Sequence, residues 1–255
     1  MTTKTVIITG ATSGIGQALA ELLCESSLPY RLILCGRRQE RLQSFEARFG
    51  KNTELCSLCF DIRNHESVLQ AMSSLKPPFD KIDVLVNNAG NAHGFEAIHE
   101  GDLGDWEAML DINVKGLLYI TKIVSGGMVA RGRGQIINLG SIAGKEPYAG
   151  GNVYCATKAA VDALTRGMRM DLHSHNIRVS AVHPGLVDTE FSEVRFKGDK
   201  NRSTKVYEGM QPLTGKDVAE TIRFMIEQPP HVNVADVLLL PTAQASSTLT
   251  HRVVE

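Results

Sequence analysis

Short apolar runs of strand length alternate with helical patterns along the whole chain, and this alternation restricts the fold more than any other feature. The apolar runs lie near residues 4–9, 31–35, 54–60, 82–86, 134–140, 177–183 and 235–240. The helical patterns lie between them, near residues 14–26, 38–49, 64–75, 104–131, 152–175 and 214–228. Repeated strand–helix units favour parallel strands with right-handed crossovers, which place helices on both faces of the sheet. The sequence therefore predicts an α/β fold with a doubly wound parallel sheet.

The length and composition fit one domain of this kind. The chain has 255 residues, 43% of them hydrophobic, which is enough to bury a large single core. No repeat, linker or low-complexity tract interrupts the pattern, so we expect one Rossmann-type domain over residues 1–255. The exception is an irregular insertion near residues 186–213, in which no clear strand is expected. It follows the carboxyl end of a strand, where ligand-binding loops belong, and we expect it to cover the substrate.

Charge and cysteine content exclude several classes of protein. The net charge of −1 indicates neither nucleic-acid nor membrane binding. No apolar stretch approaches the ~20 residues that span a bilayer, and no signal peptide is expected, so we expect a cytoplasmic protein. The five cysteines are odd in number and scattered, which argues against a disulfide framework. Cys56 and Cys59 should point to opposite faces of a strand, and we predict no metal site.

A glycine-rich turn follows the first apolar run. Gly10, Gly14 and Gly16 lie between this run, which ends at Thr9, and a helical pattern. Glycines let the backbone approach a pyrophosphate, and a helix N-terminus offers free N–H groups and a positive dipole end. A strand, a glycine-rich turn and a helix in this order indicate a dinucleotide site.

The end of the second predicted strand indicates which dinucleotide binds. An NAD enzyme usually places an acid there, to bind the ribose 2′-hydroxyl. This chain has Gly36 at that position, followed by Arg37 and Arg38. Guanidinium groups bind phosphate with forked geometry, whereas the dipole at a helix start disfavours cations. The two arginines therefore predict a 2′-phosphate, and hence NADP(H).

Tyr154 and Lys158 form the candidate catalytic pair. They lie four residues apart on a predicted helix, so both side chains can act on one spot. The unperturbed pKa of a phenol is about 10, and a nearby cation lowers it. The pair is thus a usable general acid/base for an oxygen, and Ser141, thirteen residues upstream of Tyr154, can hydrogen-bond the same atom.

With Asn87-Asn88-Ala89-Gly90, these motifs make the chain resemble the short-chain dehydrogenase/reductase family over essentially its whole length. The resemblance implies the strand order 3-2-1-4-5-6-7 and a catalytic set of Asn113, Ser141, Tyr154 and Lys158. In that family NADPH gives a hydride to a carbonyl carbon while the tyrosine protonates the oxygen and the serine positions it. The lysine holds the nicotinamide ribose and lowers the tyrosine pKa, and the asparagine holds a water. Implied cofactor-binding residues are Gly10, Thr12, Ser13, Gly14, Ile15, Gly16, Arg37, Arg38, Asp61, Ile62, Asn88, Ala89, Gly90, Tyr154, Lys158, Pro184, Gly185, Val187 and Thr189.

Three stretches resemble one subgroup of that family more closely. Residues 36–42, 147–154 and 190–199 look like those of the NADP-dependent 3-hydroxy acid dehydrogenases. That subgroup oxidises serine, allo-threonine and related short 3-hydroxy acids, and reduces malonic semialdehyde. Two residues depart from it, because the subgroup often has Glu at the position of His183 and a small residue such as Gly at that of Cys155.

A carboxylate substrate needs a cation. Arg195 in the insertion is the candidate, beside Ser141 and Tyr154 at the reacting oxygen, because a guanidinium fork pairs well with a carboxylate. Lys197, Arg202 and Lys145 are rivals, and a purely structural ion pair is an equally good reading of Arg195.

Two other functions compete, and an oligomer is expected. One alternative is a reductase of uncharged ketones or of 3-oxoacyl groups on a carrier protein, and the other is a non-catalytic NADP(H) sensor. In the family the helices near residues 104–131 and 152–175 pair across a twofold axis, so we expect a homodimer or homotetramer. Apolar residues expected to serve that pairing are Met109, Leu117, Leu118, Val161 and Leu164.

Overall fold

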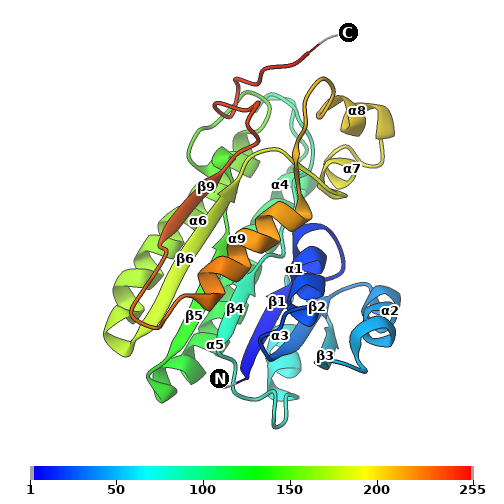
Figure 1. The fold of residues 1–255 in the computed structure, drawn as a ribbon. Coiled ribbons are helices and arrows are strands. Elements are labelled where there is room, and N and C mark those ends of the chain that lie inside the picture. Colours follow the sequence, from blue (N-terminus) through cyan, green and yellow to red (C-terminus); the bar gives the residue numbers. More distant parts are fainter. Residues whose placement is uncertain (1–2, 254–255) are drawn as a thin grey trace.

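Seven parallel strands form a single sheet in the computed structural model, which describes residues 3–253 (Figure 1). The strand order is β3-β2-β1-β4-β5-β6-β9, and β9 is the seventh strand of this sheet, so the expected order is confirmed. The strands are β1 Lys4–Thr9, β2 Tyr30–Gly36, β3 Glu54–Cys59, β4 Val84–Asn87, β5 Gly134–Leu139, β6 Ile177–Pro184 and β9 Asp236–Leu239.

Helices cover both faces of the sheet, as Figure 1 shows. They are α1 Gly14–Cys24, α2 Gln39–Phe49, α3 His65–Ser73, α4 Leu103–Leu110, α5 Leu117–Arg131, α6 Asn152–Leu172 and α9 Gly215–Glu227. Alternate residues of β1 divide the core into two layers: Val6 and Ile8 pack against α1 and α9, whereas Ile7 packs on the opposite face with α3 and α5. This division follows from the period of two in a strand, which sends successive side chains to opposite faces.

The long helix expected near residues 104–131 is interrupted. A π-helical segment, η1 (Asp111–Gly116), separates α4 from α5. Segments of this kind are rare and often occur at functional sites. The segment contains Asn113, one of the four expected catalytic residues, and buries its side chain.

The insertion near residues 186–213 contains more regular structure than expected. Its two short helices, α7 (Phe191–Arg195) and α8 (Lys200–Lys205), lie beyond the carboxyl ends of the strands (Figure 1). Two short strands, β7 (Val187–Asp188) and β8 (Leu213–Thr214), pair in parallel and close the insertion at its base. The expectation of no strand there was wrong, because two-residue strands are too short to show an alternating pattern.

The residues expected to serve an oligomer contact lie mostly inside the chain. Met109, Leu117 and Val161 are buried within the chain's own core, whereas Leu164 is partly buried and Leu118 is exposed. The expectation was wrong for the three buried residues, since their helices pack on η1, on one another and on the sheet. The large apolar side chains that these helices do expose are those of Leu103, Leu110, Leu118 and Met170.

The described cysteines are all free, and Cys56 is partly buried while Cys59 is exposed, in keeping with opposite faces of β3. Within residues 3–253, none of the helices combines the length and apolar character needed to cross a membrane.

Candidate active site

A cavity of about 1360 Å³ lies at the carboxyl end of the sheet. Its walls come from the glycine-rich turn, the end of β2, the start of α6, the insertion and the segment near residues 244–252. The cavity therefore brings together nearly all of the residues that the sequence assigned to cofactor and substrate. Gly16, Asp61 and Asn113 are the exceptions, because they do not line it.

The glycine-rich turn and the Asn88–Gly90 turn form one rigid unit. Gly10 and Gly14 adopt φ values of 67° and 55°, which L side chains rarely adopt. The Asn88 side chain donates to the backbone oxygens of Thr9 and Gly10 at 2.9 and 3.1 Å. A side chain at Gly16 would collide with that amide and with the Gly10 carbonyl. Gly16 and Asn88 thus shape the cradle at the start of α1, where a pyrophosphate would meet free N–H groups.

Arg38 is held in place beside this turn. Its guanidinium donates to Ser13 Oγ at 2.6 Å, to Thr12 Oγ1 at 3.1 Å and to Glu190 Oε2 at 2.9 Å. Arg37 is more loosely placed, since its side chain is 54% exposed and its guanidinium lies 3.8 Å from Asp61 Oδ2. Both arginines line the cavity. The arrangement leaves positive charge at the ribose end of a dinucleotide, as a 2′-phosphate requires.

Asp61 is engaged by a neighbouring arginine. Its carboxylate accepts hydrogen bonds from Arg63, which hold its pKa below the usual range. Ile62 and Arg63, rather than Asp61, line the cavity. A contact between Asp61 and the cofactor stays a prediction.

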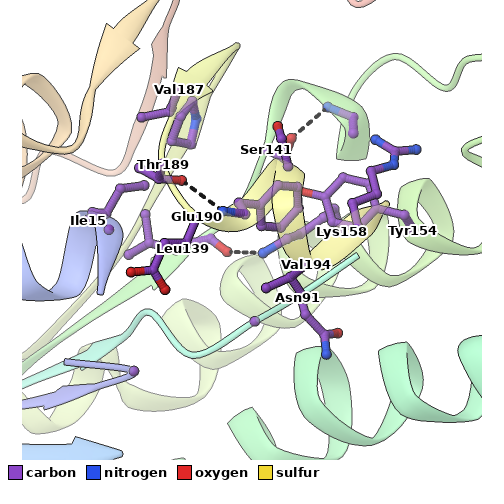
Figure 2. A pocket seen from close by; sticks show the side chains of 18 of the residues that line it. Ile15, Asn91, Leu139, Ser141, Tyr154, Lys158, Val187, Thr189, Glu190 and Val194 are labelled. Carbon is purple, nitrogen blue, oxygen red and sulfur yellow. Dashed lines mark hydrogen bonds between the residues drawn. The ribbon is translucent and has the colours of Figure 1, made fainter. Parts of the chain in front are cut away.

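Ser141, Tyr154 and Lys158 meet on the opposite side of the cavity (Figure 2). Ser141 precedes the short helix η2 (Ile142–Gly144), and its Oγ accepts from the Ala143 N–H at 3.1 Å. Tyr154 and Lys158 both lie on α6, one turn apart, and both are buried. Lys158 Nζ donates to the carbonyl of Leu139 at 2.8 Å, and burial lowers its pKa to about 8.

Several neighbouring groups change the pKa of the Tyr154 phenol. Burial raises the pKa of its phenol, the charge of nearby Tyr148 raises it further, and a hydrogen bond from Ser141 and the charge of Arg195 lower it. Arg195 is thus one cation that lowers the pKa of Tyr154, and the same effect expected of Lys158 stays a prediction. Lys158 is bonded to a backbone carbonyl, whereas the Arg195 guanidinium lies over the phenol ring.

The Asn113 side chain hydrogen-bonds the backbone of Asn91 in the cavity wall. Its Oδ1 accepts from the Asn91 N–H at 2.9 Å, and its Nδ2 donates to the Asn91 carbonyl at 2.8 Å. Nδ2 also lies 3.0 Å from Thr157 Oγ1 on α6. Asn113 thereby ties η1, α6 and the Asn88–Asn91 loop together.

Arg195, the last residue of α7, lies in an aromatic cage. Its guanidinium carbon is 4.8, 5.5 and 5.7 Å from the ring centres of Phe95, Tyr148 and Tyr154. Nη1 donates to Tyr148 OH at 2.8 Å and Nε to the Gly94 carbonyl at 3.2 Å. Nη2 is buried and has no hydrogen-bond partner among the described residues. A buried donor without a partner is costly, which points to an anionic ligand at this position.

The rival cations are engaged elsewhere. Lys197 pairs with Asp105 at 2.9 Å. Arg202 lines the cavity but lies over the Phe196 ring at 4.6 Å, farther along the insertion. Lys145, which follows η2, pairs with Asp236 at 2.9 Å and does not line the cavity. Arg195 is thus the best-placed cation for a substrate carboxylate.

Lys145 belongs to a buried polar cluster that the sequence did not indicate. His183 is 0% exposed, and its Nε2 lies 3.6 Å from Asp162 Oδ1 and 3.5 Å from Asp236 Oδ1. Among the described residues these three could in principle hold a metal ion. Lys145 also lies 3.6 Å from Asp162, and Arg166 pairs with Asp162 at 3.2 Å, so two cations face the two carboxylates and the cluster is better explained as an ion network.

Sequence reasoning missed several residues of the cavity wall. Tyr148 and Glu190 lie in family-like stretches but were given no role, and the position of Phe95 carried no signal of its own. The wall also includes Asn91, His93, Phe191, Phe196, Gln244, Thr248, Thr250 and Arg252. The last four come from an irregular segment near the C-terminus, which periodicity does not identify.

Comparison with known proteins agrees with this geometry. Residues 4–200 match the family model described as short chain dehydrogenase. The chain is 46% identical over 249 residues to an NADP-dependent 3-hydroxy acid dehydrogenase YdfG of Salmonella typhi, covering 97% of this chain and 99% of the relative. It is 40% identical over 241 residues to a serine 3-dehydrogenase of Rhizobium radiobacter, covering 94% and 95% of the two chains.

Solved structures give the same result. The fold matches a structure described as the closed form of serine dehydrogenase complexed with NADP+, with a TM-score of 0.91 and 43% identity over 98% of this chain and 100% of that one. It matches serine dehydrogenase from Escherichia coli with a TM-score of 0.82 and 39% identity, over 94% and 99% of the two chains. The chain therefore belongs to the short chain dehydrogenase family.

Proposed function

We propose that this enzyme transfers a hydride between NADP(H) and C3 of short 3-hydroxy acids of the serine, allo-threonine and 3-hydroxypropionate class. The observation that carries the substrate class is the unpartnered Nη2 of Arg195, in a buried cage beside Tyr154. A carboxylate bound there would place the neighbouring carbons against Tyr154 and Ser141. The relatives named for serine and 3-hydroxy acids support the same assignment.

NADP(H) fits the residues of the cavity. The turn at Gly10 and Gly14 brings bare backbone to the start of α1, where a side chain on the backbone would be strained. Arg37 and Arg38 would hold the 2′-phosphate, with Ser13 Oγ beside Arg38. NADP(H) supplies the hydride chemistry when it is bound, and the protein supplies orientation and electrostatics.

The chain's own residues supply proton transfer. In the reducing direction the Tyr154 hydroxyl gives its proton to the carbonyl oxygen, and Ser141 holds that oxygen by a hydrogen bond. Arg195 fixes the substrate carboxylate, and its charge favours the phenolate that Tyr154 becomes. Lys158, whose lowered pKa lies near neutrality, can take part in returning a proton to Tyr154. Asn113 keeps the surrounding loop and α6 in register.

The test is a substrate panel assayed with both cofactors. Serine, allo-threonine and 3-hydroxypropionate should be oxidised with a higher kcat/KM than neutral secondary alcohols of the same size, and NADP+ should be preferred over NAD+. A preference for neutral alcohols would instead favour the carbonyl reductase function. Cofactor binding without turnover of either class would favour a sensor, although all four expected catalytic residues are present.

We further propose that the enzyme is a cytoplasmic homo-oligomer with twofold symmetry. The exposed Leu110 and Leu118 on α4 and α5, together with Met170 on α6, support a contact with a second copy. Light scattering at micromolar concentration should give a dimer or tetramer, and a monomer would contradict this proposal.

A further inference from the structure

The carboxylate of Glu190 bridges two arginines at the cofactor end of the cavity. Oε2 accepts from Arg38 at 2.9 Å, and Oε1 accepts from Arg41 at 2.7 Å. Arg41 also donates to the Thr12 carbonyl at 3.1 Å, so the contact reaches the glycine-rich turn. Partial burial opposes ionisation of Glu190, but hydrogen bonds from the two arginines outweigh it and keep its pKa below the usual range.

Glu190 and Arg195 lie at the two ends of α7. Glu190 precedes the helix, and its carbonyl accepts from the Val194 N–H at 3.0 Å. Arg195 ends the helix in the aromatic cage. Figure 2 shows the same separation, with Glu190 on the side of Ile15 and Val194 above Asn91. The three arginines at the cofactor end, Arg37, Arg38 and Arg41, are called the 2′-phosphate clamp below. One short helix therefore connects this clamp with the candidate carboxylate site.

The helix between these ends is firmly packed. The Phe191 ring lies 5.6 Å from the Tyr154 ring. Ser192 Oγ and Tyr207 OH form a hydrogen bond of 2.7 Å, and Tyr207 in turn donates to the Val187 carbonyl at 2.7 Å. Glu190 and Arg195 are thus held relative to one another by one five-residue helix that packs on Tyr154 and Tyr207.

The net charge of the three arginines and Glu190 balances that of a bound phosphate. Arg37, Arg38 and Arg41 carry three positive charges, and Glu190 offsets one of them. A phosphate monoester carries a charge of about −1.5 to −2 near neutrality, so the clamp with Glu190 is close to balanced when the phosphate is bound. Arg38 still has N–H groups to offer, since only one of its Nη1 hydrogens is needed for Glu190.

We propose that Glu190 is a positioning residue through which the 2′-phosphate of NADP(H) orients Arg195 for the substrate carboxylate. The phosphate fixes Arg38, Arg38 fixes Glu190, and Glu190 sets the position of α7. This inference rests on the proposed function, because it assumes an anionic substrate at Arg195. By reciprocity, the 2′-phosphate and the substrate carboxylate then strengthen one another's binding. The enzyme should therefore bind its substrate more tightly with NADP(H) than with NAD(H), in addition to binding NADP(H) itself more tightly.

The test compares the substrate KM with saturating NADP+ and with saturating NAD+. In the wild-type enzyme we expect the KM for the best 3-hydroxy acid to be at least about 5-fold lower with NADP+, which is the lower end of usual coupling. Glu190→Gln keeps the shape of the side chain but removes the ionic link, so the two KM values should converge to within about twofold. Glu193→Gln is the matched control, because it removes the same charge from an exposed position on the same helix and should leave the wild-type ratio.

Two further measurements make the result specific. NADP+ should protect the insertion of the wild-type protein from limited proteolysis more than NAD+ does, and this difference should vanish in Glu190→Gln. The NADP+ affinity of Glu190→Gln, measured by calorimetry without substrate, should stay within about threefold of wild type or become tighter, because the clamp gains net positive charge.

The inference is overturned if Glu190→Gln, with an unchanged melting temperature, keeps the wild-type KM ratio and protection pattern. It is also overturned if the wild-type KM is the same with both cofactors. Failure of the proposed function gives a different result, namely a wild-type enzyme that turns over no 3-hydroxy acid; the proteolysis comparison then still tests the link between the phosphate and α7.

Discussion

The guanidinium carbon of Arg195 lies 5.7 Å from the centre of the Tyr154 ring. The residue proposed to bind the substrate carboxylate is thus also a cation that lies over the phenol ring of Tyr154. Arg195 lowers the pKa of Tyr154 against the effect of burial. The charge that lowers this pKa and the charge proposed to bind the substrate carboxylate therefore belong to the same side chain.

Replacement of Tyr154 by Phe should abolish the proton transfer while keeping the ring. We expect kcat for 3-hydroxy acid oxidation to fall at least about 100-fold, the usual effect of losing a general acid/base. The Phe191 contact needs only the ring, so NADPH affinity and the melting temperature should change little. Steady-state kinetics and a fluorescence titration measure the two effects, and retention of more than about a tenth of kcat would contradict this role.

Replacement of Arg37 or Arg38 by Ala should reduce affinity for NADP(H) much more than affinity for NAD(H). A lost charged hydrogen bond to the 2′-phosphate weakens binding by about 10- to 100-fold. The effect should be larger for Arg38, whose guanidinium is already held by Thr12 and Ser13. Calorimetric titration with each cofactor measures this, and an equal loss for both cofactors would indicate that the arginines only stabilise the turn.

Lys158 should destabilise the cofactor-free fold near neutral pH. Burial lowers its pKa from 10.5 to about 8, so the unfolded chain binds this proton more tightly than the folded one. The penalty is fully present below about pH 8, and it disappears as the pH rises to the unfolded value of 10.5. Lys158→Met should therefore be more stable than wild type at pH 7, and this advantage should shrink by pH 10. Urea unfolding at both pH values measures it, and an advantage that does not change with pH would contradict the assignment.

The parts of the fold that are repetitive were predictable. The seven strands and their order follow from apolar runs that alternate with helical patterns, and from the family resemblance. The interruption at Asp111–Gly116 was not predictable, because a π-helical segment keeps the hydrophobic pattern of a helix. The strands β7 and β8 were too short to show a pattern.

The candidate site was predictable where motifs define it and not where tertiary packing does. Ser141, Tyr154 and Lys158 follow from spacing and resemblance, and they do line one cavity. The cage of Phe95 and Tyr148 around Arg195 joins segments about 50 and 100 residues apart, and neither aromatic residue has a local pattern that would single it out. The same holds for Glu190, whose partners Arg38 and Arg41 lie on another element.

The central claim is that Arg195 binds the substrate carboxylate, and one comparison tests it most directly. Kinetics of Arg195→Ala should be measured with serine and with a neutral secondary alcohol or ketone of similar size, each against wild type. Loss of one partner of a buried charge pair costs about 2–5 kcal/mol, so kcat/KM for serine should fall by at least about 30-fold. The neutral substrate should lose much less, since it offers no carboxylate to the guanidinium and is affected only through the pKa of Tyr154. Equal losses on both substrates would show that Arg195 only holds α7 in place, and would contradict the proposed carboxylate site.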